Sequence, residues 1–276
     1  MSRWLRRLPR PSDLPSIAGV AVARALVRRR PDRGRGFVSD ETPLIIAGMH
    51  RSGTSIVTRL LERGGMYVGG SWLDENYESL YFSRANRAMC GEGPYLLHDY
   101  GWTAPKTDEF IQARRGYAER SAKGVAAFFA ERREEAHWGW KDPRNSLTLP
   151  VWLSVYPNAS VLHVVRDGRA VALSLAERDG LDPSFGLALW GHYAERAERA
   201  MQPVPEPRRL TVRFEDLTEA PVPTLEKLYK FAGLTPTARL EQIAADVNRE
   251  RGSAPLADPR VAEMGDHPLL ARYSYR

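Results

Sequence analysis

Cysteine is nearly absent from this sequence, and long apolar runs are absent altogether. The single cysteine, Cys90, excludes an internal disulfide framework and a zinc site built from cysteines. It suits a reducing compartment, so we expect a cytoplasmic protein. No uninterrupted apolar stretch approaches the ~18–20 residues of a membrane-spanning helix. The length of 276 residues is enough for one large domain with its own core.

Lysine is also scarce, since it supplies only five of the 40 basic residues. The formal net charge is +6, and all of this excess lies near the N-terminus. Residues 1–43 hold ten arginines and four acidic residues, whereas the rest of the chain holds thirty basic and thirty acidic residues. Because residues 44–276 carry no net charge, they are not expected to form a basic surface that binds nucleic acid, and we expect no nucleic-acid partner.

The charge therefore divides the chain into a basic N-terminal arm, residues 1–41, and a single domain, residues 42–276. Prolines and clustered arginines make a flexible basic tail the simplest interpretation of the arm. Two functional alternatives are a weak contact with an anionic membrane, which would place the protein at the membrane periphery, and a contact with another polyanion.

Short apolar runs alternate with helical patterns along the domain. Strands separated by helices form a parallel sheet that helices cover on both faces, so the predicted fold class is α/β with a central parallel sheet flanked by helices. Short apolar runs predict strands at residues 43–48, 160–165 and 209–214. Helical spacing of apolar residues, together with capping residues, predicts helices at residues 54–63, 108–135, 167–178, 221–232 and 236–249.

The first strand leads into the first helix through the loop G-M-H-R-S-G-T-S, residues 48–55. Its frame is that of a phosphate-binding loop in which Thr54 replaces the usual lysine. Glycines let backbone N–H groups turn inward, and the start of a helix carries a partial positive charge. The loop is therefore predicted to bind a phosphate or sulfate group.

The cation of this loop is Arg51, three positions before the replaced lysine. No apolar strand ends in a lone acidic residue suited to magnesium, because residues 161–165 run into Arg166 before Asp167. We therefore expect an anion that is handled without a metal ion. A tight glycine turn with a capping hydroxyl would explain the second glycine and the threonine, but not the whole R-S-G-T-S run after a buried strand.

The loop resembles the 5′-phosphosulfate loop of sulfotransferases that use 3′-phosphoadenosine 5′-phosphosulfate (PAPS). Cytosolic members carry a lysine in this loop, whereas bacterial and tyrosylprotein-type members carry an arginine, as at Arg51. The resemblance implies a P-loop-like sulfotransferase fold and in-line transfer of a sulfuryl group from PAPS to a hydroxyl or amine. It also implies that PAPS is bound by Arg51, Ser52, Gly53, Thr54 and Ser55.

A second motif, V-V-R-D-G-R-A-V-A-L-S, lies at the end of the strand predicted at residues 160–165. An arginine at a strand end can present a planar donor fork to a phosphate. Ser174 follows Arg166 by about two helical turns, so it can share the helix face near the strand end. In the resembled family an arginine and a serine at this spacing bind the 3′-phosphate of the nucleotide, which implies that role here. The alternative is an arginine paired with an acid and a buried helix serine.

Two further segments extend the resemblance. Residues 138–144, W-G-W-K-D-P-R, are similar to the W-x-K-[DE]-P segment whose lysine contacts the transferring sulfuryl group, which implies that role for Lys141. A fixed cation stabilises the charge that builds on the oxygens during transfer. The alternative is a surface lysine beside Asp142, and we assign the two tryptophans to the core. In R-F-E-D-L, after the third strand, we interpret Glu215 and Asp216 as structural.

The general base is expected shortly after the first helix, where tyrosylprotein-type and many bacterial members carry a glutamate. Glu78 is our candidate, because it precedes an apolar group at the position where related bacterial sequences carry an acid. Its alternative role is to cap or solvate the start of a helix. Asp74, Glu75 and His98 are the reserve candidates. Catalysis is thus assigned to Glu78 together with the cations Lys141 and Arg51.

Two other functions share parts of this pattern. A P-loop kinase or other nucleotide phosphotransferase has the same cradle, although its lysine and its magnesium-binding acid are missing here. A non-enzymatic polyanion-binding protein would act through the arm and show steep salt dependence. For the sulfotransferase, the acceptor classes left open are saccharide, lipid, peptide and small natural product.

Overall fold

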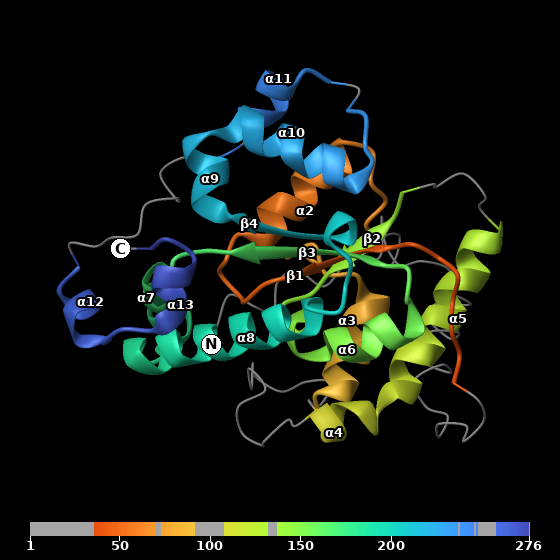
Figure 1. The fold of residues 1–276 in the computed structure, drawn as a ribbon, viewed down its shortest axis with the longest axis horizontal. Coiled ribbons are helices and arrows are strands. Elements are labelled where there is room, and N and C mark those ends of the chain that lie inside the picture. Colours follow the sequence, from red (N-terminus) through yellow and green to blue (C-terminus); the bar gives the residue numbers. More distant parts are fainter. Residues whose placement is uncertain are drawn as a thin grey trace, which may run out of the picture.

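A four-stranded parallel sheet forms the centre of the protein (Figure 1). The computed structural model describes residues 36–69, 73–91, 108–131, 137–236, 238–245, 247 and 258–275. In spatial order the strands are β2 (Gly139–Lys141), β1 (Leu44–Ala47), β3 (Ser160–Val165) and β4 (Arg209–Arg213). The predicted α/β class with a central parallel sheet is confirmed.

Each face of the sheet has its own apolar core. Ile45 belongs to one core, whereas Leu44 and Ile46 belong to the other, because successive side chains of a strand point to opposite faces. All of β1 is buried, and a continuous apolar run is the pattern that a strand covered on both faces requires. Trp138 and Trp140 are buried in the first core, which confirms their predicted placement.

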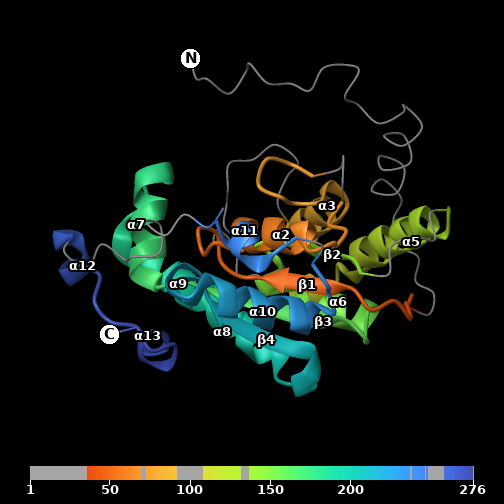
Figure 2. The ribbon, with the colours of Figure 1, turned by 90° about the horizontal axis from the view of Figure 1, so that it is seen from above.

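Helices cover the two faces in separate layers (Figure 1). The layer over Leu44 and Ile46 consists of α2 (Thr54–Arg63), α9 (Phe214–Glu219), α10 (Pro221–Ala232) and α11 (Leu240–Ala244). The core on the opposite face is formed with α3 (Leu80–Met89), α4 (Asp108–Gln112), α5 (Arg115–Glu131), α6 (Asn145–Val155), α7 (Gly168–Asp179), α8 (Pro183–Met201), α12 (Pro259–Glu263) and α13 (Pro268–Arg272). Seen from above, α7 and α12 lie at one end of the molecule and α5 at the other (Figure 2).

Capping residues set the ends of several helices. Asp167, the predicted cap, accepts a hydrogen bond from the N–H of Arg169 at the start of α7. Asp182 caps α8 in the same way, and Pro183 follows at the first helical position, where no N–H donor is needed. α10 ends at Gly233, whose φ of 67° is the left-handed conformation that glycine adopts readily.

Some predicted elements are corrected by the structure. The helix predicted at residues 108–135 is divided into α4 and α5, and residues 132–136 lie outside the described chain. Of the helix predicted at 236–249, the described residues contain α11, which buries Ile243 and Ala244; residues 237, 246, 248 and 249 lie outside the described chain. The helices α3, α9, α12 and α13 were not predicted, and neither were β2, α6 and α8. β2 is only three residues long, α6 is buried on almost every side, and the capping signal of α8 was missed.

The last residues of the predicted arm contact the domain. The N–H of Ser39 donates to the carbonyl oxygen of Val155 at 2.8 Å, and Arg115 Nη2 donates to the carbonyl oxygen of Phe37 at 3.2 Å. The arm up to residue 35 and the reserve base His98 lie outside the described residues. Among the described helices, none combines the length and apolar character that crossing a bilayer requires.

The carboxyl ends of β1, β2 and β3 meet at one edge of the sheet. In the parallel register, Ile46 lies beside both Lys141 and Leu162. The loops that follow these strands therefore start side by side. In open α/β sheets, ligands bind outside this edge, so it is the place to look for a site.

Candidate functional site

The loop between β1 and α2 packs closely because of two glycines. Gly48 has a φ of 149° and Gly53 a φ of 82°. A Cβ on Gly48 would lie 2.4 Å from the carbonyl oxygen of Val164, and a Cβ on Gly53 would lie 2.2 Å from the ring of Phe214. Both distances are far too short for real contacts, so the loop reaches β3 and the start of α9 only because these positions lack side chains.

The N-terminus of α2 is open to an anion. Its N-cap residue is Gly53, which has no side chain to cap the helix, and its first turn contains no acidic residue. The buried hydroxyl oxygen of Ser52 has no hydrogen-bond partner among the described residues. An uncapped helix start presents N–H donors and a partial positive charge, whereas at α7 that place is taken by Asp167. The donors at α2 therefore fit a phosphate or sulfate group.

Arg51 joins this loop to the second predicted motif. Its Nε donates a hydrogen bond to Ser174 Oγ at 2.8 Å, and Arg166 Nη1 donates to the carbonyl oxygen of Arg51 at 3.1 Å. The φ of Arg51 is 70°, a conformation that is unfavourable for residues other than glycine, and these two bonds stabilise it. Ser174 is only partly buried and contacts the loop, so its alternative role as a merely buried helix serine is wrong.

The segment before α3 lies against the start of α2. Ser55 Oγ donates to the carbonyl oxygen of Asn76 at 2.9 Å. Asp74 Oδ1 accepts from the backbone N–H groups of Asn76 and Glu78, both at 2.8 Å. The backbone of Glu78 also pairs with Lys141 as an isolated parallel bridge. Glu78 is thereby placed between the anion-binding loop and the end of β2.

Glu78 and Lys141 form a buried ion pair. Lys141 Nζ lies 3.2 Å from Glu78 Oε1, and the side chains of Lys141 and Glu78 are 2% and 9% exposed. The alternative of a surface lysine is therefore wrong. Glu78 also does not solvate the start of α3, because it is buried and Ser79 is the N-cap residue.

Two more charged residues adjoin this pair. Arg144 Nη1 lies 3.2 Å from Asp142 Oδ1 and 3.8 Å from Glu78 Oε2. Burial raises the pKa of Asp142 to about 6, opposed by Arg144 and reinforced by Glu78. The cluster combines two acidic and two basic side chains, and this balance is what makes burial of four charges at one place tolerable.

The reserve candidates for the base lie in less suitable places. Asp74 uses one carboxylate oxygen to hold the backbone of its own loop, and its pKa is raised by burial and by the charge of Glu78. Glu75 is exposed, and His98 lies outside the described residues. Glu78 is the candidate that combines burial, a position beside the loop and contact with a cation.

A buried polar network that no sequence motif indicated lies next to the charged cluster. Asn145 Nδ2 donates to the carbonyl oxygen of Ile46, and Asn145 Oδ1 accepts from Asn86 Nδ2 and Trp140 Nε1. Asn86 Oδ1 accepts from Trp152 Nε1 at 2.7 Å. The network ties α3 and α6 to β1 and β2, so it fixes the chain on both sides of the ion pair. The sequence offers only the two asparagines themselves, and their burial follows from the fold.

The residues interpreted as structural have structural contacts. Glu215 Oε1 accepts from the backbone N–H of Asp167 at 2.9 Å, which joins the start of α9 to the turn after β3. Asp216 lies 3.7 Å from Arg213, and its carbonyl oxygen accepts from Thr224 Oγ1. These contacts support the interpretation made from R-F-E-D-L.

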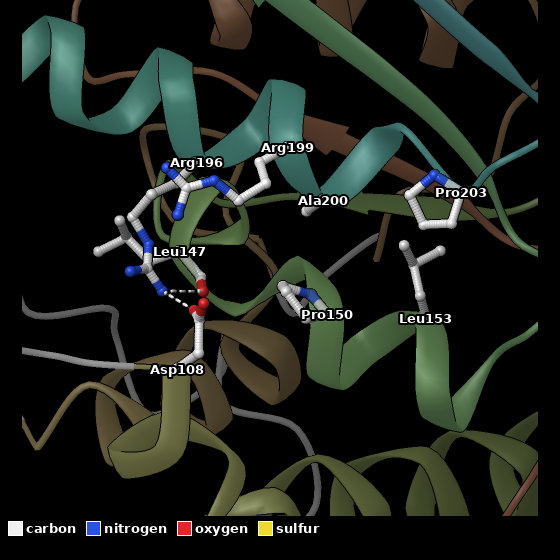
Figure 3. A pocket seen from close by; sticks show the side chains of 8 residues that line it. All are labelled: Asp108, Leu147, Pro150, Leu153, Arg196, Arg199, Ala200 and Pro203. Carbon is white, nitrogen blue, oxygen red and sulfur yellow. Dashed lines mark hydrogen bonds and ion pairs between the residues drawn. The ribbon is translucent and has the colours of Figure 1, made fainter.

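A separate hollow of about 320 Å³ lies between α4, α6 and α8 (Figure 3). Arg196 lies at its edge, where Nη2 contacts Asp108 Oδ1 at 2.5 Å and the carbonyl oxygen of Leu147 at 3.3 Å. None of the predicted site residues in the described part of the chain lines this hollow, so it is distinct from the anion-binding loop. Its lining consists of Asp108, Leu147, Pro150, Leu153, Arg196, Arg199, Ala200 and Pro203.

Known proteins resemble the chain over most of its length. The model of the sulfotransferase family matches residues 43–238. The sulfotransferase domain of the olefin synthase from Synechococcus PCC 7002 is 18% identical with a TM-score of 0.55, and the alignment covers 90% of this chain and 99% of that domain. A sulfotransferase from Mycobacterium tuberculosis H37Rv is 17% identical with a TM-score of 0.54, covering 92% and 81%. A sulfotransferase from Alicyclobacillus acidocaldarius is 19% identical with a TM-score of 0.50, covering 86% and 92%. No curated protein sequence matches the chain significantly.

Proposed function

The chain belongs to the sulfotransferase family, and on this premise we propose that the sulfuryl donor of the enzyme is PAPS. Membership makes the chain an enzyme that transfers a sulfuryl group to an acceptor. The observation that carries the proposal is the meeting of Arg51, Arg166 and Ser174 beside the open N-terminus of α2. PAPS has two anionic groups, a 5′-phosphosulfate and a 3′-phosphate, and this arrangement supplies a cation for each.

We assign the hydrogen-bond donors of the site to the two anionic groups of PAPS as follows. Residues 51–55 would hold the 5′-phosphosulfate, because the start of α2 follows Gly53 directly and the buried Ser52 hydroxyl next to it has no hydrogen-bond partner among the described residues. Arg166 and Ser174 would hold the 3′-phosphate, and the guanidinium can offer two parallel donors to it. In the described residues no group of three or more histidine, cysteine or acidic side chains is arranged to hold a metal ion.

Bound PAPS would supply an activated sulfuryl group and leave as adenosine 3′,5′-bisphosphate (PAP). Lys141 would place a fixed positive charge at the edge where β1 and β2 end, next to the oxygens on which negative charge builds. The same ammonium orients Glu78 through its Oε1. We assign to the Glu78 carboxylate the acceptance of the proton from the acceptor hydroxyl or amine.

The proposal is tested by binding and by transfer. Calorimetry should detect PAP binding in the absence of magnesium, and ATP with magnesium should bind far more weakly. Labelled PAPS should then transfer its sulfuryl group to a member of an acceptor panel of saccharides, lipids, peptides and small natural products. Tight magnesium-dependent ATP binding without PAP binding would overturn the proposal in favour of a phosphotransferase.

A deletion separates the domain from the basic arm. It should remove residues 1–35 and keep Phe37 and Ser39, because these two contact the domain. PAP affinity should be the same in the full-length and shortened proteins. A loss of PAP binding on deletion, with steep salt dependence in the full chain, would show that the arm rather than the loop binds the anion.

A further inference from the structure

The C-terminal segment reaches the turn that carries Arg166. The hydroxyl of Tyr275, which is 7% exposed, donates to Glu215 Oε2 at 2.7 Å. The other oxygen of the same carboxylate accepts from the backbone N–H of Asp167 at 2.9 Å. One buried carboxylate therefore joins three segments that are distant in sequence: the chain after α13, the start of α9 and the turn between β3 and α7.

The position of Tyr275 is itself fixed by the fold. Its backbone N–H donates to the carbonyl oxygen of Leu270 in α13 at 2.8 Å, after a turn in which Ser274 has a φ of 63°. The guanidinium of Arg213 lies over the Tyr275 ring, 4.8 Å from its centroid. Burial and the charge of Glu215 raise the pKa of Tyr275, so its hydroxyl remains a donor at neutral pH.

Arg166 depends on the same turn for its direction. It directly precedes Asp167, donates to the carbonyl oxygen of Arg51, and its guanidinium lies 5.5 Å from the centroid of the Phe214 ring. Fixing the Asp167 N–H fixes the peptide that joins Arg166 to the turn. A guanidinium can form two parallel hydrogen bonds to a phosphate only when its plane is held in one orientation.

We propose that Tyr275 is a positioning residue for the nucleotide, acting through Glu215 and the Asp167 N–H to orient Arg166 toward a 3′-phosphate. The inference rests on the proposed function, since it assigns the 3′-phosphate of PAPS or PAP to Arg166. It makes the last turn of the chain part of the nucleotide site, although Tyr275 itself would not touch the ligand.

The test compares two ligands on two matched variants. Tyr275→Phe removes the hydroxyl that binds Glu215, and Tyr273→Phe removes a hydroxyl from the same segment whose ring lies beside His163 and Trp190. Calorimetry measures PAP, which has a 3′-phosphate, and adenosine 5′-monophosphate, which lacks it. We expect Tyr275→Phe to weaken PAP binding about five- to tenfold and to leave adenosine 5′-monophosphate binding unchanged, because one charge-assisted hydrogen bond is lost at a distance from the 5′ end. Tyr273→Phe should bind both as the wild type does.

Hydrogen exchange gives a second readout that needs no ligand. The amides of residues 166–169 should exchange faster in Tyr275→Phe than in the wild type or in Tyr273→Phe. Unchanged PAP affinity in Tyr275→Phe would overturn the inference, and so would an equal loss for both nucleotides, which indicates general damage. A wild type that binds no PAP would overturn the proposed function first and the inference with it, so the two failures are distinguishable.

Discussion

The ammonium of Lys141 lies 3.2 Å from a carboxylate oxygen of Glu78, and both side chains are buried. The two residues are 63 positions apart and meet because the segment before α3 pairs with the end of β2. Burying one of these charges without the other would be strongly unfavourable, so each is needed to hold the other in place. This contact joins the cation that we propose for the transferring sulfuryl group to the carboxylate that we propose as the base.

Glu78→Gln should lower turnover by about 10²–10⁴, because the amide cannot accept a proton from the acceptor. PAP affinity should remain near that of the wild type, since Glu78 does not belong to the nucleotide donors. Steady-state transfer and calorimetry measure the two quantities. Turnover near that of the wild type would remove Glu78 as the base.

Two further variants show whether a loss of turnover is chemical or structural. Glu75→Gln is the matched control, because this side chain is exposed and should leave turnover unchanged. Glu78→Gln combined with Lys141→Met removes both charges of the pair, so it should be more stable than Lys141→Met alone while remaining inactive. Recovery of activity in the double variant would contradict the assignment of both residues.

Ser174→Ala should weaken PAP binding roughly tenfold, because it removes the acceptor that holds Arg51 Nε at 2.8 Å and the hydroxyl that we propose as a donor to the 3′-phosphate. The fold should be unaffected, because alanine is a better helix former than serine. Ser184→Ala, at an exposed position near the start of α8, is the control. Equal PAP affinity in the two variants would show that Ser174 has no part in the site.

Gly53→Ala should be among the most damaging single-methyl additions in this chain. The new Cβ would lie 2.2 Å from the Phe214 ring at a φ of 82°, so both steric and conformational costs apply. Gly65→Ala is the matched control, because its φ is 98° but nothing lies within 4 Å of the new Cβ. We expect the control to lose roughly 1–2 kcal/mol of unfolding free energy and Gly53→Ala to lose clearly more, together with PAP binding. Equal stability of the two variants by urea denaturation would contradict the close packing of the loop.

Stability should fall in mild acid because of His163. Burial lowers the pKa of this histidine from 6.5 to about 4, so the folded state keeps it neutral while the unfolded state takes up a proton. Its contribution is fully present above pH 6.5 and is lost as the pH falls toward 4, by roughly 2–3 kcal/mol in all. Urea denaturation of the wild type and of His163→Leu from pH 7 to pH 4.5 should show the wild type losing more stability. Parallel pH curves would contradict the buried neutral histidine.

Local patterns in the sequence predicted much of the fold. The helices at residues 54–63 and 221–232 and the strand at 160–165 have the predicted bounds, because apolar period, capping residues and terminal glycines act over a few residues. β2 was missed since three residues give no period, and its strand conformation comes from pairing with β1. α6 was missed since burial on nearly all sides removes the polar face that marks a helix in sequence.

In the candidate site, too, the sequence predicted local features but not the contacts between distant segments. The loop glycines and Arg51 were proposed as anion-binding residues from the loop pattern, because a helix start presents N–H donors. Arg166 and Ser174 were proposed from the spacing that they share with the resembled family. The spacing did not predict which distant residues these side chains contact in the folded protein. Arg51 and Ser174 are 123 positions apart, and the amides of Asn86 and Asn145 meet across α3 and α6. Such contacts arise only after strands have paired and helices have packed on them.

By itself, the sequence determined the local chemistry of this protein: a glycine loop with an arginine, a second arginine at a strand end and a neutral domain behind a basic N-terminal arm. The tertiary structure alone decided that Lys141 is buried against Glu78, that Arg51 contacts Ser174, and that Tyr275 donates a hydrogen bond to Glu215. Backbone preferences and caps depend on neighbours along the chain, whereas the burial and pairing of a charge depend on which distant segments the sheet brings together.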